Sequence, residues 1–222
     1  MTEIQSEAKA PSERTKMRRY AWLANYEQDT IKAVIDAGFV CQVGYVIDGQ
    51  PYVTPTNHWR IDDKVYWHGS SASRMLRAQS KEIPVCFSVT HVDGLVLSRA
   101  AFNHNVNFRS VMAFGNAEFV EEDEKQRALA IFTDRIAPGL WEHARKPTEQ
   151  EWKATRIIRL KLDEASAKIR IGPPIDEPDD YKSDCWAGII PFKTIALAAE
   201  SDPKLRPGIE VPDFVRAFKL PA

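Results

Sequence analysis

The chain has 222 residues, of which 44% are hydrophobic and 27% are charged, and its formal net charge is −1. This length predicts one domain with extensions rather than two domains, and it is sufficient to bury a sizeable core. A chain without an excess of basic residues cannot neutralise many backbone phosphates, so we expect no nucleic acid partner.

The cysteines and the N-terminal residues indicate the compartment. Cys41, Cys86 and Cys185 form no C-x-x-C pair, and the first two lie in apolar runs that predict packing in the core. The first 20 residues carry charges where a secretion signal needs an apolar stretch, and no run approaches the roughly 20 apolar residues of a membrane helix. We therefore expect a reducing, cytoplasmic location and no membrane partner.

The predicted elements begin after a polar tail, residues 1–17, which lacks a periodic apolar face and is predicted to be flexible. Residues 18–222 are predicted to form one domain. Its first helix is expected from about Asp29 to Ala37, because the apolar residues there fall on one stripe and Gly38 follows as a stop signal.

Three strands are predicted to follow as a meander. Phe39 to Ile47 and Pro51 to Arg60 are rich in β-branched and aromatic residues, and Asp48-Gly49 between them is a strong hairpin signal. A second turn at Asp62-Asp63 leads into a third predicted strand, Lys64 to His68.

The second half of the chain predicts further strands, two helices and an extended end. Asp93-Gly94 interrupts one strand, Gly115 marks a candidate bulge in the next, and the prolines from Pro173 onward predict an extended C-terminal segment draped over the body or a partner. Strands at hairpin spacing without βαβ alternation predict a mainly β fold, an antiparallel barrel with peripheral helices. The predicted ranges are strands at 84–97, 108–120, 155–162 and 167–171 and helices at 121–136 and 148–154.

The stretch His68-Gly69-Ser70-Ser71-Ala72-Ser73-Arg74 is the most informative part of the sequence. Here a strand is predicted to run into a short helix, Ser70 to Ala78, whose first amides are unpaired and carry partial positive charge. Gly69 permits close approach of the backbone, the serines donate hydrogen bonds and Arg74 supplies a planar cation. These features suit a phosphate monoester. The alternative is an ordinary capped helix with Arg74 facing water.

Three further features each have a structural and a cofactor-binding interpretation. Arg109, beside Ser110, enters an apolar strand, where an arginine either turns outward or finds an anion. The Thr54-Pro55-Thr56 run is typical of an edge strand, or else leaves carbonyls and hydroxyls that can meet a planar heterocycle. Trp186 is either a core or interface anchor or a ring stacked on a cofactor.

The histidines lack the spacing of a metal site. None pairs with another at i,i+4 beside an acid, as on a hydrolytic zinc helix. G-x-S-x-G, P-loop and G-x-G-x-x-G motifs are also absent, which disfavours hydrolase, NTPase and Rossmann interpretations. We expect no metal ligands among His58, His68, His91, His104 and His143.

Several stretches combine into a more specific pattern. In chain order they are Val43 to Val46, Asp48 to Pro55, Tyr66 to Ser70 with Ser73-Arg74, Phe108 to Gly115, Glu164 to Arg170, Gly172-Pro173-Pro174 and Trp186-Ala187-Gly188. In this order they resemble the flavin-binding branch of the pyridoxamine 5′-phosphate oxidase-like superfamily, to which nitroimidazole-resistance proteins are similar. The resemblance spans about residues 18–215.

The resemblance implies a six-stranded antiparallel split β-barrel with peripheral helices. It further implies a homodimer that holds FMN in each of two clefts between the subunits. One departure concerns the substrate, because Trp186 is followed by Ala-Gly-Ile-Ile-Pro-Phe-Lys instead of the Arg-x-His-Asp-Arg-like stretch that grips the substrate in authentic oxidases. Oxidation of vitamin B6 is therefore not expected.

The resemblance also implies contacts with the cofactor. His68 is implied to contact the flavin, as a histidine does in nitroimidazole-resistance proteins, and is the single candidate catalytic residue. Trp186 is expected to reach the cleft from the partner chain. The other implied contacts are phosphate ligands at Gly69, Ser70, Ser73 and Arg74, an isoalloxazine edge at Thr54 and Pro55, and further contacts at Asn107, Arg109 and Ser110.

The implied function is an FMN-dependent oxidoreductase that acts on a small molecule, with NADH or NADPH as the candidate donor and the flavin carrying the electron chemistry. Two alternatives stay open. One is a split barrel that binds haem through a histidine. The other is a non-catalytic flavin carrier or sensor.

Overall fold

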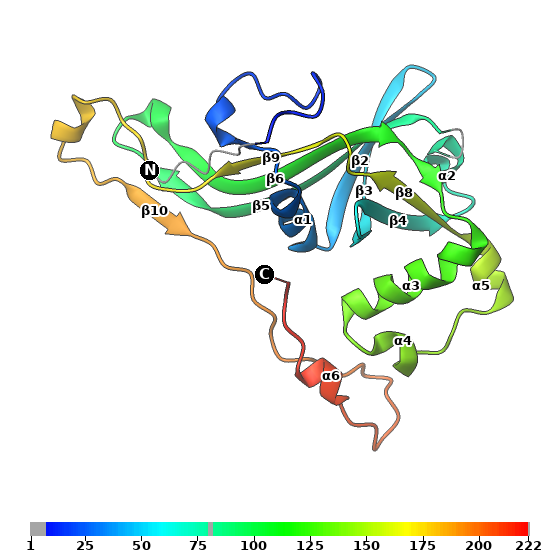
Figure 1. Ribbon diagram of the computed structural model, residues 1–222. Coiled ribbons are helices and arrows are strands. Elements are labelled where there is room, and N and C mark those ends of the chain that lie inside the picture. The colour runs from blue at the N-terminus through cyan, green and yellow to red at the C-terminus, as the bar shows by residue number, and fades with distance from the viewer. Residues whose placement is uncertain (1–7, 80–81, 222) are drawn as a thin grey trace.

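The computed structural model describes residues 8–79 and 82–221. A ten-stranded antiparallel sheet dominates it (Figure 1). The strands are β1 (Ala24–Asn25), β2 (Val40–Ile47), β3 (Gln50–Ile61), β4 (Lys64–Ser70), β5 (Pro84–Leu97), β6 (Asn105–Asn116), β7 (Glu118–Phe119), β8 (Thr155–Lys161), β9 (Ala165–Arg170) and β10 (Gly188–Pro191). They run side by side in the order β1-β9-β6-β5-β2-β3-β4-β8-β7, and β10 pairs with β5.

Within the described residues, six short α-helices and three 3-10 turns lie around the sheet. The α-helices are α1 (Gln28–Asp36), α2 (Arg74–Gln79), α3 (Glu122–Ile136), α4 (Leu140–His143), α5 (Glu149–Ala154) and α6 (Asp213–Arg216). The 3-10 turns are η1 (Ala21–Leu23), η2 (Ala101–Asn103) and η3 (Asp180–Lys182).

The hairpin between β2 and β3 forms as its turn signal predicts. Asp48 and Gly49 have φ angles of 49° and 79°, which suit the two central positions of a tight turn that matches the twist of its strands. The last residues of β3, His58–Ile61, leave β2 and pair with β4. One long strand therefore joins the two parts of the sheet.

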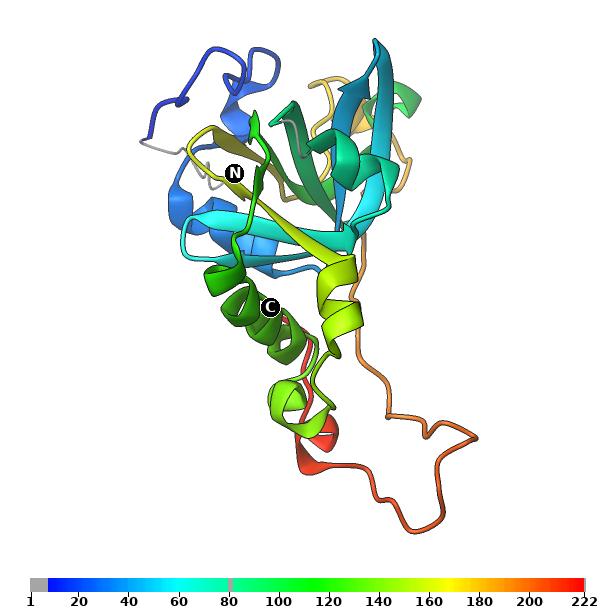
Figure 2. The same cartoon turned by 90° about the vertical axis from the view of Figure 1, so that its right-hand side faces the viewer.

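The main core lies on one face of the sheet, where every second side chain of β2 and of β5 up to Val89 is buried together with residues of α1. Cys41 is fully buried there, as predicted, whereas Cys86 is half-buried. A second core cluster lies on the other side of β3 and β4, where Trp59 and Tyr66 pack against α3. Figure 2 shows α3 lying along this part of the sheet.

The predicted fold class is confirmed. The sheet is antiparallel and carries peripheral helices, and among the described residues it stays open rather than closing into a complete barrel. Three short strands, β1, β7 and β10, join the strands that the sequence predicts. The expected interruption in β5 is a shift of register between Val92 and Gly94, so the strand bulges and continues.

The bulge predicted at Gly115 is wrong. Val85 pairs with Gly115, and the β5–β6 register is regular on both sides of this pair, from Pro84 paired with Asn116 to Val92 paired with Phe108. The glycine is required instead by close packing, because a Cβ atom there would lie 2.7 Å from Cδ1 of the buried Leu160.

The two ends of the chain behave differently. Residues 1–7 of the predicted tail lie outside the described residues, and of the rest Thr15 is buried and Arg14 bonds to Glu164 at 2.9 Å. The C-terminal segment is extended, as predicted. After β10 it leaves the sheet and returns as α6 beside α4 (Figure 1), where the Phe214 ring lies 5.2 Å from that of His143.

Candidate functional site

The predicted phosphate cradle, Gly69, Ser70, Ser73 and Arg74, lies where β4 ends and α2 begins. The hydroxyl of Ser70 accepts a hydrogen bond from the amide of Ala72 at 3.2 Å, and that of Ser73 accepts one from the amide of Leu76 at 3.1 Å. Ser73 therefore caps α2, while Ser70 holds the turn that precedes the helix. Each hydroxyl keeps a proton that it can donate.

Arg74 is exposed, and its side chain lies against the β2–β3 hairpin. Its Nη1 donates to the hydroxyl of Tyr52 at 3.3 Å, and the guanidinium lies 5.3 Å from the centre of that ring. Tyr52 stacks on Tyr45 with 5.6 Å between ring centres, and the hydroxyl of Tyr45 lies 3.0 Å from that of Thr54. The structure thus brings Thr54 and Arg74 to one cluster.

Tyr45 and Tyr52 are absent from the residues predicted for the site. A signal for them exists in the sequence, because they stand equally far from the Asp48-Gly49 turn and must pair directly across the hairpin. Pro55 is not part of the cluster. It follows Thr54 in the strand, so it faces the opposite side of the sheet, where it is exposed.

The three β6 residues predicted to contact the cofactor bind other groups of the chain. Arg109 holds both carboxylate oxygens of Asp93 at 3.0 Å, so it has found its anion within the chain. The amide of Asn107 donates to the carbonyl of Gly172 at 3.1 Å. Ser110 donates to the carbonyl of Lys168 at 3.3 Å.

Trp186 lies on the segment that leads into β10. Its side chain is exposed, and its ring lies 2.7 Å from the position that a Cβ atom on Gly188 would take. Within the described ranges, no hydrogen bond joins Trp186 or the β6 residues to the cradle. Their roles as cofactor contacts stay predictions.

His68 faces the side of the sheet that α3 covers. Its ring lies 4.8 Å from that of Phe132 in α3 and 5.9 Å from that of Trp59. Its Nδ1 atom is buried and has no hydrogen-bond partner among the described residues. Burial lowers the pKa of His68, so the ring is neutral at pH 7.

Three of the five histidines are committed to backbone groups. Nε2 of His58 bonds to the carbonyl of Ile35 and Nε2 of His91 to that of Val34, while Nδ1 of His104 accepts from an amide. In the part of the chain that the structure describes, the rings of the other two, His68 and His143, make no hydrogen bond. The same residues contain no group of three or more His, Cys, Asp or Glu side chains that could hold a metal ion.

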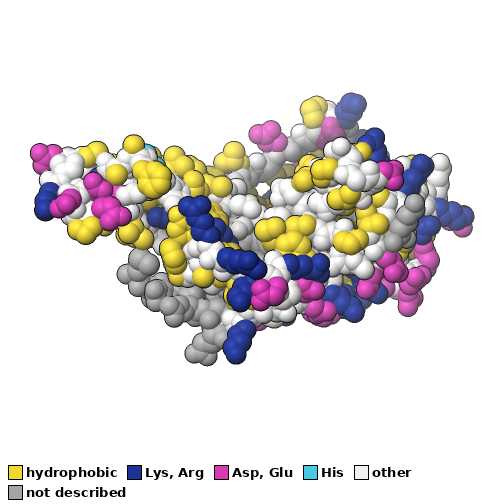
Figure 3. Space-filling model, turned by 90° about the horizontal axis from the view of Figure 1, so that it is seen from above, with side chains coloured by type: hydrophobic (Ala, Val, Ile, Leu, Met, Phe, Trp, Pro, Cys, Tyr) yellow, Lys and Arg dark blue, Asp and Glu magenta, His cyan; other side chains and the backbone are white. Residues whose placement is uncertain are grey.

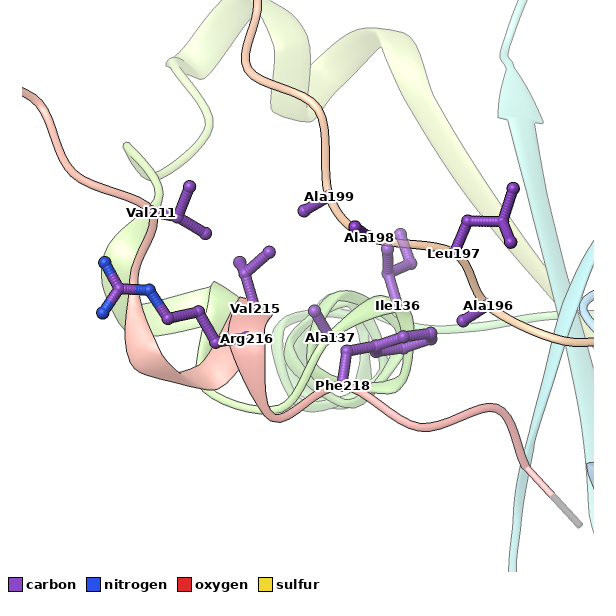
Figure 4. Close-up of a pocket in the computed structure, with 10 residues that line it drawn as sticks. All are labelled: Ile136, Ala137, Ala196, Leu197, Ala198, Ala199, Val211, Val215, Arg216 and Phe218. Atoms are coloured by element: carbon purple, nitrogen blue, oxygen red, sulfur yellow. The ribbon is translucent and has the colours of Figure 1, made fainter.

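A cavity of about 750 Å³ lies between the end of α3 and the C-terminal segment (Figure 4). Both histidines with unbonded rings contact elements that form it. Phe132, which packs on His68, lies one helical turn before Ile136, and Phe214, which packs on His143, belongs to α6. The cavity is lined by Ile136, Ala137, Ala196, Leu197, Ala198, Ala199, Val211, Val215, Arg216 and Phe218.

The lining is apolar apart from Arg216. The Arg216 side chain points away from the other lining side chains (Figure 4). Its guanidinium contacts Glu210 and Asp213 at 3.3 and 3.5 Å. The C-terminal segment supplies eight of the ten lining residues. The arrangement suits a mostly apolar ligand.

Sequence comparison identifies the family. The model of a family described as pyridoxamine 5′-phosphate oxidase matches residues 27–169, more than half of the chain. The chain belongs to the pyridoxamine 5′-phosphate oxidase family. A comparison with curated proteins gave no match.

Solved structures extend this family relationship. The flavocytochrome Anf3 from Azotobacter vinelandii is 44% identical with a TM-score of 0.92, and the match covers 96% of this chain and 100% of that one. An FAD and haem binding protein from Mycobacterium smegmatis is 31% identical with a TM-score of 0.85, covering 89% and 97%. A candidate 5-nitroimidazole antibiotic resistance protein from Bacteroides thetaiotaomicron shares the fold, with 21% identity, a TM-score of 0.55 and coverage of 66% and 86%.

The extents of these matches differ at the C-terminus. The family match ends at residue 169, before the segment that lines most of the cavity. A match over 96% of the chain leaves out only about 4% of it, so the match to the flavocytochrome must include most of that segment. Separately, none of the helices in the described residues is long and apolar enough to cross a membrane.

Proposed function

We propose that this member of the pyridoxamine 5′-phosphate oxidase family binds a flavin nucleotide and a haem and transfers electrons between them. The observation that carries the proposal is the cavity between the end of α3 and the C-terminal segment. Neither histidine is among its lining residues, but His68 packs on Phe132 of α3 and His143 on Phe214 of α6, the two helices that contribute to its wall. Two similar structures support the proposal: a flavocytochrome, whose match must include most of the C-terminal segment, and a protein described as binding FAD and haem.

The residues around the cavity fit a haem. Its volume of about 750 Å³ lies within the range of small-molecule sites, and apart from Arg216 its lining residues have apolar side chains. A neutral imidazole can ligate iron, and burial keeps His68 neutral. The chain has no C-x-x-C-H motif, so the haem would be held without covalent links. Arg216 would have to leave Glu210 and Asp213 to pair with a propionate.

The residues around the cradle fit the phosphate of a flavin nucleotide. Arg74 can donate two parallel hydrogen bonds to phosphate oxygens, and Ser70 and Ser73 keep protons to donate. Thr54 lies in the same cluster through Tyr45. We propose FMN as the nucleotide. FAD carries the same ribityl phosphate, and release from the protein followed by chromatography distinguishes the two.

The chemistry in this proposal belongs to the cofactors, since a flavin exchanges one or two electrons and a haem exchanges one. The chain binds and orients them and excludes water from the apolar cavity. NADH or NADPH is the proposed donor, and the acceptor is a small molecule. The three cysteines are all free, and we keep a cytoplasmic location as part of the proposal.

We also propose that the functional unit is a homodimer. Several apolar side chains on the outer face of the sheet are exposed, among them Val53 and Met112. Apolar side chains also gather on the elongated end of the molecule, at the left of Figure 3. Phe102, in η2, is 96% exposed. Such area is typical of protein interfaces. Light scattering of the purified protein should give twice the mass of the chain.

An absorption spectrum of the protein purified with its cofactors tests the cofactor proposal. We expect flavin bands together with a Soret band, and we expect both to change when NADH or NADPH is added without oxygen. A Soret band without flavin bands would indicate that the protein binds haem alone. Flavin bands without a Soret band would indicate that it binds flavin alone. Bound cofactors that neither donor reduces would support a carrier or sensor.

A further inference from the structure

The cation of the cradle is held by an aromatic ring from another element. Arg74 begins α2, whereas Tyr52 belongs to β3, and their contact is both a hydrogen bond of 3.3 Å and a cation–π contact of 5.3 Å. Arginine has many rotamers, and ordering an exposed one costs side-chain entropy. A ring beneath the guanidinium selects the rotamers that keep it beside the hairpin.

Tyr52 is itself fixed. It stacks on Tyr45 at an angle of 15°, and Tyr45 is 6% exposed. The hydroxyls of Tyr45 and Thr54 lie 3.0 Å apart, which ties the inner ring to the same strand as Tyr52. A buried tyrosine therefore supports a half-buried one, and that one supports the exposed arginine.

We propose that Tyr52 is a positioning residue that sets the Arg74 guanidinium for the phosphate of the flavin nucleotide. This inference rests on the proposed flavin site and adds to it a residue on the hairpin. A guanidinium binds phosphate oxygens best as a planar fork, so its orientation matters as well as its charge. The hydroxyl of Tyr52 fixes one edge of that plane and leaves the other edge to the ligand.

A positioning role and a purely structural role of Tyr52 differ in their effects on the binding of FMN and of riboflavin. Riboflavin carries the isoalloxazine ring and ribityl chain of FMN but lacks the phosphate. A residue that acts through Arg74 should affect FMN and leave riboflavin alone. A residue that only holds the hairpin together should affect both ligands equally.

The test uses the full chain stripped of its flavin, titrated with FMN and with riboflavin while flavin fluorescence is followed. Arg74→Gln should weaken FMN binding about 10- to 100-fold, the range for losing charge-assisted hydrogen bonds. Tyr52→Leu should weaken it about 3- to 10-fold, because a contact of this kind contributes about 1 kcal/mol. Tyr52→Phe, which keeps the ring, should weaken it less. Riboflavin binding should stay within about twofold throughout.

Two controls separate this role from general damage. Tyr181→Leu removes an exposed tyrosine that also lies under an arginine, Arg99 at 4.8 Å, and it should leave both titrations unchanged. The double variant Tyr52→Leu/Arg74→Gln should bind FMN no more weakly than Arg74→Gln alone, because Tyr52 acts through Arg74. Circular dichroism shows whether each variant is folded.

Three results would overturn the inference. Tyr52→Leu could weaken FMN and riboflavin equally, which would make Tyr52 a structural residue of the hairpin. It could leave FMN binding unchanged, or add its full effect on top of Arg74→Gln. If the unmodified chain binds neither FMN nor FAD, the proposed flavin site itself fails, and that failure is recognised before any variant is compared.

Discussion

The Nε2 atom of His58 lies 2.9 Å from the carbonyl oxygen of Ile35 in the last turn of α1. A carbonyl can only accept, so the neutral ring must carry its proton on Nε2. The other ring nitrogen, Nδ1, is buried and has no partner among the described residues. Protonating the ring would therefore bury an unpaired N–H and a charge, and burial lowers the pKa of His58 to about 4.

The pKa of His58 predicts a loss of stability in mild acid. The unfolded chain has a histidine pKa of about 6.5, so between pH 6.5 and pH 4 it binds a proton that the folded chain does not. The free energy of unfolding should fall across this window by up to about 3 kcal/mol. Urea unfolding at pH 7.5, 6, 5 and 4.5 measures the fall.

His58→Gln is the matched control for this prediction. Glutamine has an amide that can donate to the Ile35 carbonyl but does not titrate, so the variant should lose stability less steeply as the pH falls. Parallel curves for the two proteins would show that His58 is not the source of the acid sensitivity. Other titrating groups are common to both proteins and cancel in the difference.

Arg135 is predicted to connect the wall of the cavity to α1. It stands just before Ile136 and Ala137 of that wall, and its Nη2 donates to the carbonyls of Asp36 and Gly38 at 2.7 and 2.6 Å. Because both carbonyls would lose a charged donor, Arg135→Leu should lower the free energy of unfolding by about 2 to 3 kcal/mol.

Arg145→Leu is the control, because Arg145 is exposed and pairs with Glu151 on the surface. It should change stability much less than Arg135→Leu, since exposed ion pairs contribute little. Equal effects of the two substitutions in urea unfolding would contradict the role given to Arg135.

Gly94 is predicted to be essential for docking of the C-terminal segment. A Cβ atom there would lie 2.7 Å from the carbonyl oxygen of Ile190 and 3.1 Å from Cα of Pro191, both backbone atoms of β10. Gly94→Ala should push β10 off β5, so limited proteolysis should release the end of the chain faster. Gly44→Ala, whose Cβ atom would meet its neighbours at an ordinary 3.6 Å, should leave the digestion rate unchanged.

The strands from β2 to β4 and the helix α3 follow from the sequence because their signals are local. The Asp48-Gly49 turn sets the hairpin, and its register pairs Tyr45 with Tyr52. Gly115 shows the limit of such signals, since a glycine in a strand can mark a bulge or a close contact and only the position of Leu160 distinguishes them.

The cavity could not be predicted in the same way. Its lining joins the end of α3 to a mostly irregular segment that lies far along the chain, at residues 196–218. That segment has no hydrophobic periodicity from which a helix or strand could be predicted. The backbone contacts of His58 and His91 likewise depend on where α1 packs. The family resemblance singled out His68 and left the other four histidines without a role, whereas the structure separates His68 and His143 from the three that bond to backbone groups.

Haem titration into the cofactor-free chain, followed by the Soret band, tests whether the cavity between α3 and the C-terminal segment binds haem. The unmodified chain should bind one haem, His68→Ala or His143→Ala should abolish the ligated spectrum, and Ala198→Trp, which fills the cavity, should prevent binding. Ala33→Trp, at an exposed position on α1, should bind haem normally. Haem binding that persists unchanged in both histidine variants and in Ala198→Trp would contradict the account.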